Sequence, residues 1–340
     1  MRSDDLAGVD FPAGPDGRRS TSAVGRAVVA DALRAADPVL AQRAEREANW
    51  RTGYLTHFRA LVEAGLASPD VAVAVAAGGL DSLYRQLRAV GADGAESGLD
   101  ALLTAPARRA LALVPVTGTA AALRTLAVPY RGTVLHGDAL GRQLAAWVAA
   151  GTVEPSFATA VDEVARHPDW LRLEGWTVAV LGAGAEMGPV STLLGWGARV
   201  LAVDLPQPAI WERLLTAARD GAGTLLVPVG GLGAAEEGAS LARRAGADLV
   251  SDVASVADGL AAAADFAAGG SLVLANYAYA DGAGHVRVAA AVDALTRRVQ
   301  AQRAEREANW RTGYLTHFRA LVEAGLASPD VAVAVAAGGL

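Results

Sequence analysis

The hydrophobic pattern changes its period along the chain. Between residues 171 and 295, short apolar runs typical of strands alternate with longer stretches typical of amphipathic helices. The expected strands cover residues 176–181, 198–203, 223–229, 248–250 and 271–275. Alternating strands and helices with short connections predict a parallel sheet with helices on both faces. We therefore expect a doubly wound α/β domain over 171–295.

The first ninety residues have a helical period instead. Residues 1–20 are rich in Gly, Pro and charged side chains and predict a flexible tail, and residues 21–90 predict a helical region. One long helix is expected from Val39 to about Leu66. Its apolar residues recur at helical spacing and predict one buried face, made of Tyr54, Leu55, Phe58, Leu61 and Val62.

Residues 91–170 predict a small α/β segment on the substrate side. Strands are expected over 110–116 and up to Leu135, where polar residues follow. Polar groups at strand ends in α/β layers often face a ligand crevice, which makes Tyr130, Arg131, His136 and Asp138 the substrate-side candidates of this segment. Of these, His136 is the candidate catalytic residue. The alternative is that His136 and Asp138 only stabilise a turn.

The C-terminal part contains a repeat. Residues 301–340 copy residues 41–80 letter for letter, within an expected helical tail over 296–340. Solenoid repeats diverge and run in tandem, so a recent duplication, a chimera or a sequence-assembly artefact explains the identity better than functional symmetry. Two identical amphipathic segments would compete for one docking groove, and the helical regions could therefore form a homo-oligomer.

Glycines and one acid mark the candidate cofactor site. The first apolar run ends in Gly182-x-Gly184-x-x-x-Gly188, and the second ends in Asp204. This arrangement is typical of the opening of a dinucleotide-binding βαβ unit. The expected cofactor-binding residues are Gly182, Gly184, Glu186, Met187, Gly188, Asp204, Leu205 and Asn276.

Two details depart from the usual motif. The glycine spacing is one residue longer, and Pro189 restricts the helix start to about Met187. Glu186 would also place a negative charge near the phosphates. The alternative is a glycine turn that merely packs a helix on the sheet.

Residues 176–204 resemble the NAD(P)-binding Rossmann domain of dehydrogenases, and the run at 195–204 is similar to its passage from helix to second strand. The resemblance implies NAD as the cofactor, with Asp204 on the adenosine ribose hydroxyls. The Ala-, Gly- and Arg-rich usage of the whole chain is similar to that of proteins from high-GC bacteria.

A dense polar cluster follows the last expected strand. We interpret His285 or Tyr277 as a possible acid or base, Asp281 as an orienting carboxylate and Arg287 as an anion clamp. We expect at least one of the four to lie within side-chain reach of the Gly182–Gly188 loop.

Composition excludes several chemistries. All 30 basic residues are Arg, which excludes a Walker A or Schiff-base lysine, and the absence of Cys excludes thiolate nucleophiles and disulfides. The net charge of -6 argues against nucleic acid as a partner. A polar N-terminus and the lack of a long apolar run predict a cytoplasmic protein without membrane contact.

We therefore expect an NAD-dependent oxidoreductase that acts on a small-molecule substrate and uses no metal. The first alternative is a methyltransferase that uses S-adenosylmethionine. It is weaker because Leu181 stands where such enzymes often carry an acid before the first glycine. The second alternative is a non-catalytic binding or regulatory module, because no complete catalytic constellation is visible.

Overall fold

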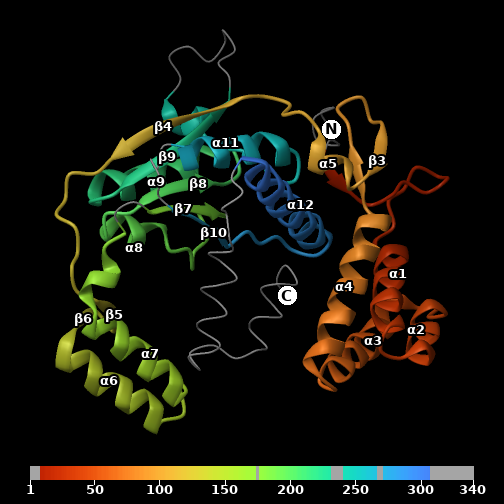
Figure 1. Cartoon of the computed structure of the whole chain (residues 1–340), viewed down its shortest axis with the longest axis horizontal. Coiled ribbons are helices and arrows are strands. Elements are labelled where there is room, and N and C mark those ends of the chain that lie inside the picture. Colours follow the sequence, from red (N-terminus) through yellow and green to blue (C-terminus); the bar gives the residue numbers. More distant parts are fainter. Residues whose placement is uncertain (1–7, 174–175, 231–239, 266–270, 307–340) are drawn as a thin grey trace. The chain divides into compact units, whose positions relative to one another are not determined.

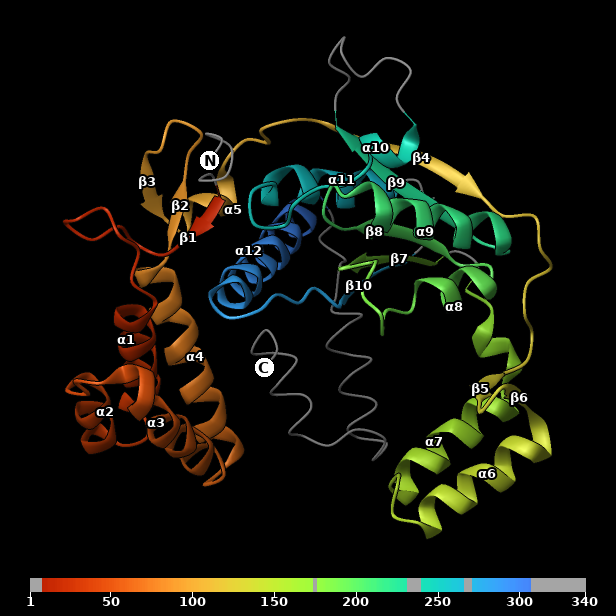
Figure 2. The ribbon, with the colours of Figure 1, turned by 180° about the vertical axis from the view of Figure 1, so that it is seen from behind.

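The chain is a mixed α/β protein. Its computed structural model describes residues 8–173, 176–230, 240–265 and 271–306. The chain forms two compact units (Figures 1 and 2). Unit 1 contains the chain up to Arg108, residues 248–257 and the chain from Tyr279 onward. Unit 2 contains residues 109–247 and 258–278.

Unit 2 is built on a five-stranded sheet in the order β10-β7-β8-β9-β4. Its strands are β4 (Leu111–Thr117), β7 (Trp176–Leu181), β8 (Arg199–Val203), β9 (Thr224–Gly230) and β10 (Ser271–Asn276). The pairs β10–β7, β7–β8 and β8–β9 are parallel, and β4 pairs antiparallel with β9. After β7, the chain adds β8 and β9 on one side of β7. It then returns and adds β10 on the other side of β7.

The central strands are buried on both faces, as expected from their continuous apolar runs. On one face, alternate residues such as Val178, Val200 and Val227 form a core with α8 (Val190–Gly195) and α9 (Pro208–Asp220). Trp211 is fully buried in this core, and its indole N–H donates to the Leu205 carbonyl at 2.9 Å.

The rest of unit 2 is mainly helical. Its further elements are β5 (Val128–Tyr130), β6 (Thr133–Leu135), α6 (Gly137–Ala149), α7 (Pro155–Arg166), a 3-10 helix (Pro168–Leu171), α10 (Leu241–Arg244) and the second part of α11 (Val253–Asp265). A Cβ added to Gly259 of α11 would lie 3.9 Å from the side chain of Leu111, whereas Val114 and Val116 pack on the opposite face with α9.

Unit 1 combines a helical bundle with a small antiparallel sheet. Its elements are β1 (Gly8–Asp10), α1 (Thr21–Arg34), α2 (Pro38–Glu45), α3 (Trp50–Gly65), α4 (Pro69–Gln86), β2 (Arg88–Val90), β3 (Glu96–Gly98), α5 (Ala101–Thr104) and α12 (Ala283–Arg306). The sheet order is β1-β2-β3. Helices α1 to α4 pack together, with Val29, Ala30 and Leu33 of α1 in their shared core.

A polar network joins α12 to α4 within unit 1. The Tyr84 hydroxyl donates to Asp293 at 2.6 Å, and Arg297 pairs with the same carboxylate at 3.0 Å. Burial and the hydrogen bond to Asp293 raise the pKa of Tyr84 well above its usual range. Tyr84 therefore stays neutral and donates to Asp293 across the usual pH range.

The predicted buried face of the second expected helix is wrong except at Leu61, which is partly buried and packs on the core of the bundle. The chain breaks after α2 and begins α3 at Trp50, and the buried residues of α3 are His57 and Ala60. Tyr54, Leu55, Phe58 and Val62 are exposed instead. Small residues on the buried face let α1 approach closely, whereas the large apolar side chains would hold the helices apart. Helical spacing cannot distinguish these two faces.

Several predicted boundaries also differ. Residues 8–20 are not a flexible tail, because Val9 and Phe11 are buried. Residues 91–170 do not form a separate segment, since β4 belongs to the same sheet as β7. The predicted strand over 248–250 is a turn whose Val250 carbonyl accepts from Val9 N at 3.0 Å.

The predicted tail over 296–340 begins inside α12, which starts at Ala283 and belongs to unit 1. Beyond Arg306, the copied segment lies outside the described residues. Within the described ranges, no helix is long and apolar enough to span a bilayer.

Candidate functional site at the carboxyl edge of the unit 2 sheet

The predicted cofactor residues come together at one edge of the sheet. In the parallel register, Leu181 lies opposite both Val203 and Asn276. The residues that follow, Gly182 and Asp204, therefore leave the sheet at the same edge, the carboxyl ends of β7 and β8. The eight predicted cofactor residues lie on these two loops and at the end of β10.

The first two glycines are required by the packing of the protein itself. Gly182 has φ +73°, and a Cβ there would lie 2.6 Å from the carbonyl oxygen of Tyr277. A Cβ on Gly184 would lie 2.6 Å from the side chain of Ile210. These contacts support the alternative in which the glycines pack the loop. They explain the glycines without a ligand.

Asp204 binds the glycine loop directly. One carboxylate oxygen accepts from Gly184 N at 2.7 Å, and the other accepts from Leu205 N at 2.7 Å. Each oxygen of an ionised carboxylate can accept a second hydrogen bond, so both keep capacity for a ligand hydroxyl. The acid and the glycine loop, 20 residues apart in sequence, thus form one local structure.

Two loop amides remain available. The N–H groups of Gly182 and Ala183 donate to Val203 O, and those of Ala185 and Gly188 donate within the loop. Across the described ranges, no acceptor is recorded for the N–H groups of Glu186 and Met187. The side chain of Met187 is 90% exposed, so a ligand can reach this part of the loop.

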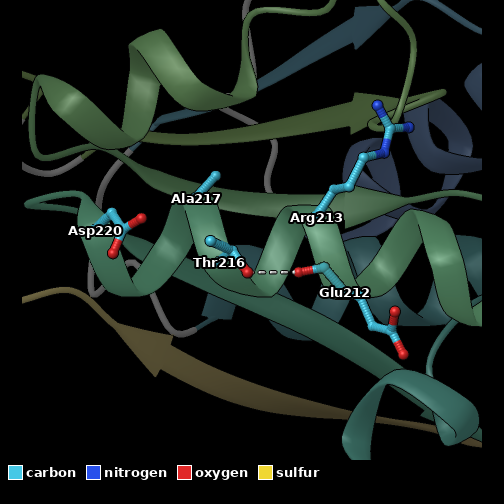
Figure 3. A pocket seen from close by; sticks show the side chains of 5 residues that line it. All are labelled: Glu212, Arg213, Thr216, Ala217 and Asp220. Atoms are coloured by element: carbon cyan, nitrogen blue, oxygen red, sulfur yellow. Dashed lines mark hydrogen bonds between the residues drawn. The ribbon is translucent and has the colours of Figure 1, made fainter.

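Arg213 also reaches the loop, which the sequence did not indicate. Its Nη2 donates to the Gly184 carbonyl at 3.1 Å from the first half of α9. Arg213 also lines a hollow of about 440 Å³ along α9, and Figure 3 shows the side chains of its lining residues. The other lining residues, Glu212, Thr216, Ala217 and Asp220, lie on the same helix. A cation and the Asp204 carboxylate therefore flank Gly184.

The predicted polar cluster is divided between the two units. Tyr277 lies beside the loop: its N–H donates to Leu181 O at 2.7 Å, and its carbonyl is next to Gly182. Tyr277 is therefore next to the loop through its backbone, and the expectation that one of the four side chains reaches the loop stays a prediction. The Asn276 side chain accepts from Ala278 N at 3.1 Å and holds this turn.

The other three candidates belong to unit 1. Arg287 donates from Nε to Val9 O at 2.6 Å and lies 3.6 Å from the Asp10 carboxylate. Asp281 accepts from the Tyr279 hydroxyl at 2.9 Å, and this bond raises the pKa of Tyr279. The His285 ring lies 5.4 Å from the Tyr279 ring, and its buried Nδ1 has no hydrogen-bond partner among the described residues.

His136 is the N-cap of α6, with an exposed side chain that makes no capping hydrogen bond. Arg131 has φ +48° and Gly132 has φ +77°, which makes residues 128–135 a tight hairpin rather than one strand. His136 therefore makes no capping hydrogen bond that would stabilise this turn, and its catalytic role stays a prediction.

Unit 1 contains a polar cluster that the sequence analysis missed. Helix α3 buries His57, whose Nε2 lies 3.3 Å from a carboxylate oxygen of Glu47, and Trp50 stacks on the His57 ring. The sequence signal that could have shown this cluster is a histidine seven residues after a tryptophan, because that spacing places both side chains on one face of a helix. In the part of the chain that the structure describes, no group of acidic residues and histidines is arranged to hold a metal ion.

Comparison with protein-family models, with curated proteins and with solved structures finds no match to this chain.

Proposed function

We propose that unit 2 binds a dinucleotide, NAD, at the carboxyl edge of its sheet and that the protein is an NAD-dependent oxidoreductase. The observation that carries this proposal is the 2.7 Å hydrogen bond between Gly184 N and Asp204. It brings the glycine loop and the acid after the second parallel strand into contact at an edge with exposed backbone N–H groups.

The strand order supports the same proposal. In the order β9-β8-β7-β10, strands β8 and β9 extend the sheet on one side of β7, and β10 extends it on the other side. Ligands of open α/β sheets bind where this change of direction opens a crevice at the carboxyl ends of the strands. The glycine loop follows β7 and Tyr277 follows β10, so both flank that position. Helix α11 lies near Leu111 on one face of the sheet, and α9 lies near Val114 on the other face. We therefore propose a doubly wound, Rossmann-like arrangement for this sheet.

The residues present fit a dinucleotide in part. Asp204 would accept hydrogen bonds from the ribose hydroxyls, and the N–H groups of Glu186 and Met187 would donate to the pyrophosphate. Bound NAD would supply a hydride acceptor for a small-molecule substrate. Tyr277, 40% exposed beside the loop, is the candidate that would exchange the accompanying proton.

The alternatives keep different support. S-adenosylmethionine also carries a ribose that Asp204 could bind, so a methyltransferase uses the same edge. A non-catalytic binding module is supported by the packing role of Gly182 and Gly184 and by the placement of His285, Asp281 and Arg287 in unit 1.

The remaining expectations stay proposals. We propose a cytoplasmic protein that binds neither nucleic acid nor membranes. The exposed apolar side chains of α3, among them Leu55 and Val62, support association of copies through the helical regions.

A titration with three ligands tests the function. Calorimetry of the purified full chain with NAD, NADP and S-adenosylmethionine should give one NAD site per chain. Adenosine-type contacts alone would produce similar binding of all three ligands and favour a general nucleotide module. Binding of S-adenosylmethionine without NAD would replace the oxidoreductase with the methyltransferase.

A further inference from the structure

A pocket of about 530 Å³ lies where α2 passes into α3, in unit 1. It is lined by Gln42, Arg43, Arg46, Glu47, Ala48 and His57. The break between the two helices creates it, because residues 46–49 turn the chain and bring Glu47 back against α3. The pocket belongs to unit 1 and shares no lining residue with the candidate cofactor site.

The polar floor of this pocket is a hydrogen-bonded pair. His57 has a nine-tenths buried side chain, and its Nε2 lies 3.3 Å from a Glu47 carboxylate oxygen. The other Glu47 oxygen accepts from Asn49 N at 2.9 Å. The Asn49 N–H, with the His57 ring as a second donor, holds the pKa of the Glu47 carboxyl below its usual range. Glu47 therefore stays ionised, and each of its oxygens accepts one hydrogen bond from within unit 1.

Two glycines make room for this pair. A Cβ on Gly53 of α3 would lie 2.5 Å from the Glu47 carboxyl carbon. A Cβ on Gly25 of α1 would lie 2.9 Å from the Trp50 indole nitrogen. A glycine inside a helix costs about 1 kcal/mol relative to alanine. Both glycines admit the groups that position His57, so the arrangement is sterically specific.

Arginines at the rim give the pocket its charge. Arg43 lies in the last turn of α2, and Arg46 is its C-cap. Within the described ranges, no ion pair is recorded for either, although Arg34 and Arg59 nearby pair with Glu45 and Glu63. Arg26 of α1 adds a third cation, because its Nη1 donates to the Glu47 carbonyl at 2.9 Å.

We propose that this pocket binds the oxyanion of a small molecule, a phosphate or a carboxylate group. Arg43 and Arg46 are the charged donors, and His57, oriented by Glu47 and Trp50, is the polar group at the base. Guanidinium groups suit such ligands because they offer several N–H donors in one plane. Glu47 is the one acid among the lining residues, and the hydrogen bonds from Asn49 N and the His57 ring offset part of its negative charge.

The repeat provides a matched control. Arg303, Arg306 and His317 stand in the copy where Arg43, Arg46 and His57 stand in the first segment. Arg303 and Arg306 lie in α12 and are not among the residues that line the pocket. Their substitution therefore removes the same two charges from outside the pocket.

The test is calorimetry of the full chain with inorganic phosphate and with succinate as separate probes. We expect one site per chain, and the tighter probe identifies the anion class. Arg43→Gln with Arg46→Gln should weaken binding about tenfold or more, because charge-assisted hydrogen bonds are lost. Arg303→Gln with Arg306→Gln should leave the affinity unchanged.

His57→Gln should also weaken binding, because it removes the hydrogen bond that offsets part of the Glu47 charge. The exposed arginines keep the test valid if His57→Gln fails to fold. The proposal is overturned if neither probe binds, if the Arg43/Arg46 variant binds as the unmodified protein does, or if the Arg303/Arg306 variant loses as much affinity.

Discussion

Gly182→Ala is expected to destabilise unit 2 more than any other alanine substitution of a glycine at its carboxyl edge. The left-handed conformation alone costs a non-glycine residue about 1–2 kcal/mol. The added methyl group would also meet backbone atoms of Tyr277 and Ala278 at 2.6–2.7 Å, and overpacking of this kind costs about 1–3 kcal/mol more. Denaturant unfolding measures the sum, and NAD binding should be lost with it.

Gly151→Ala separates the two contributions. Gly151 has φ +68°, and an added Cβ would meet nothing within 4 Å. Its substitution should therefore cost only the conformational part. Equal losses of stability in the two variants would contradict this prediction. They would show that Gly182 does not pack against the backbone of Tyr277 and Ala278.

Asp204→Asn is expected to reverse part of the cofactor preference. Removing the charge weakens the hydrogen bonds to the ribose hydroxyls and removes the repulsion of a ribose phosphate. We expect NAD affinity to fall about tenfold or more, since charge-assisted hydrogen bonds contribute about 1.5–3 kcal/mol each. NADP affinity should fall less.

Arg213→Gln should lower the affinity for NADP more than the affinity for NAD, because the guanidinium beside Gly184 would attract the phosphate of NADP. Arg219→Gln is the matched control: it removes the same charge from the exposed side of the same helix. Dissociation constants of both nucleotides, measured for the three variants, check this prediction. An unchanged NAD:NADP ratio in Asp204→Asn would remove Asp204 from the ribose site.

The sequence predicted unit 2 better than unit 1, for a physical reason. Continuous apolar runs bounded by glycines define buried parallel strands. The carboxyl ends of parallel strands meet at one edge of the sheet, regardless of how the helices pack. The loop after Leu181 and the acid at 204 were therefore placed together by sequence alone. The expected strand over 248–250 failed because its two apolar residues, Leu249 and Val250, carry too little pattern to distinguish a strand from a turn.

Unit 1 depends on contacts that sequence spacing does not contain. The face of α3 that packs on α1 is selected by small residues, Gly53 and Ala60, and by a histidine that pairs with Glu47. Arg213 was missed for a similar reason: its role follows from the position of α9 beside the glycine loop, not from its distance in sequence from Asp204.

Amide hydrogen exchange with and without saturating NAD tests the central claim most directly. Binding at the carboxyl edge should slow exchange at Glu186, at Met187 and in the first turn of α8, and leave residues 50–65 of α3 unchanged. Saturation with NAD that leaves the 182–188 loop unprotected, or protection confined to unit 1, would contradict the assignment of the cofactor site to this edge.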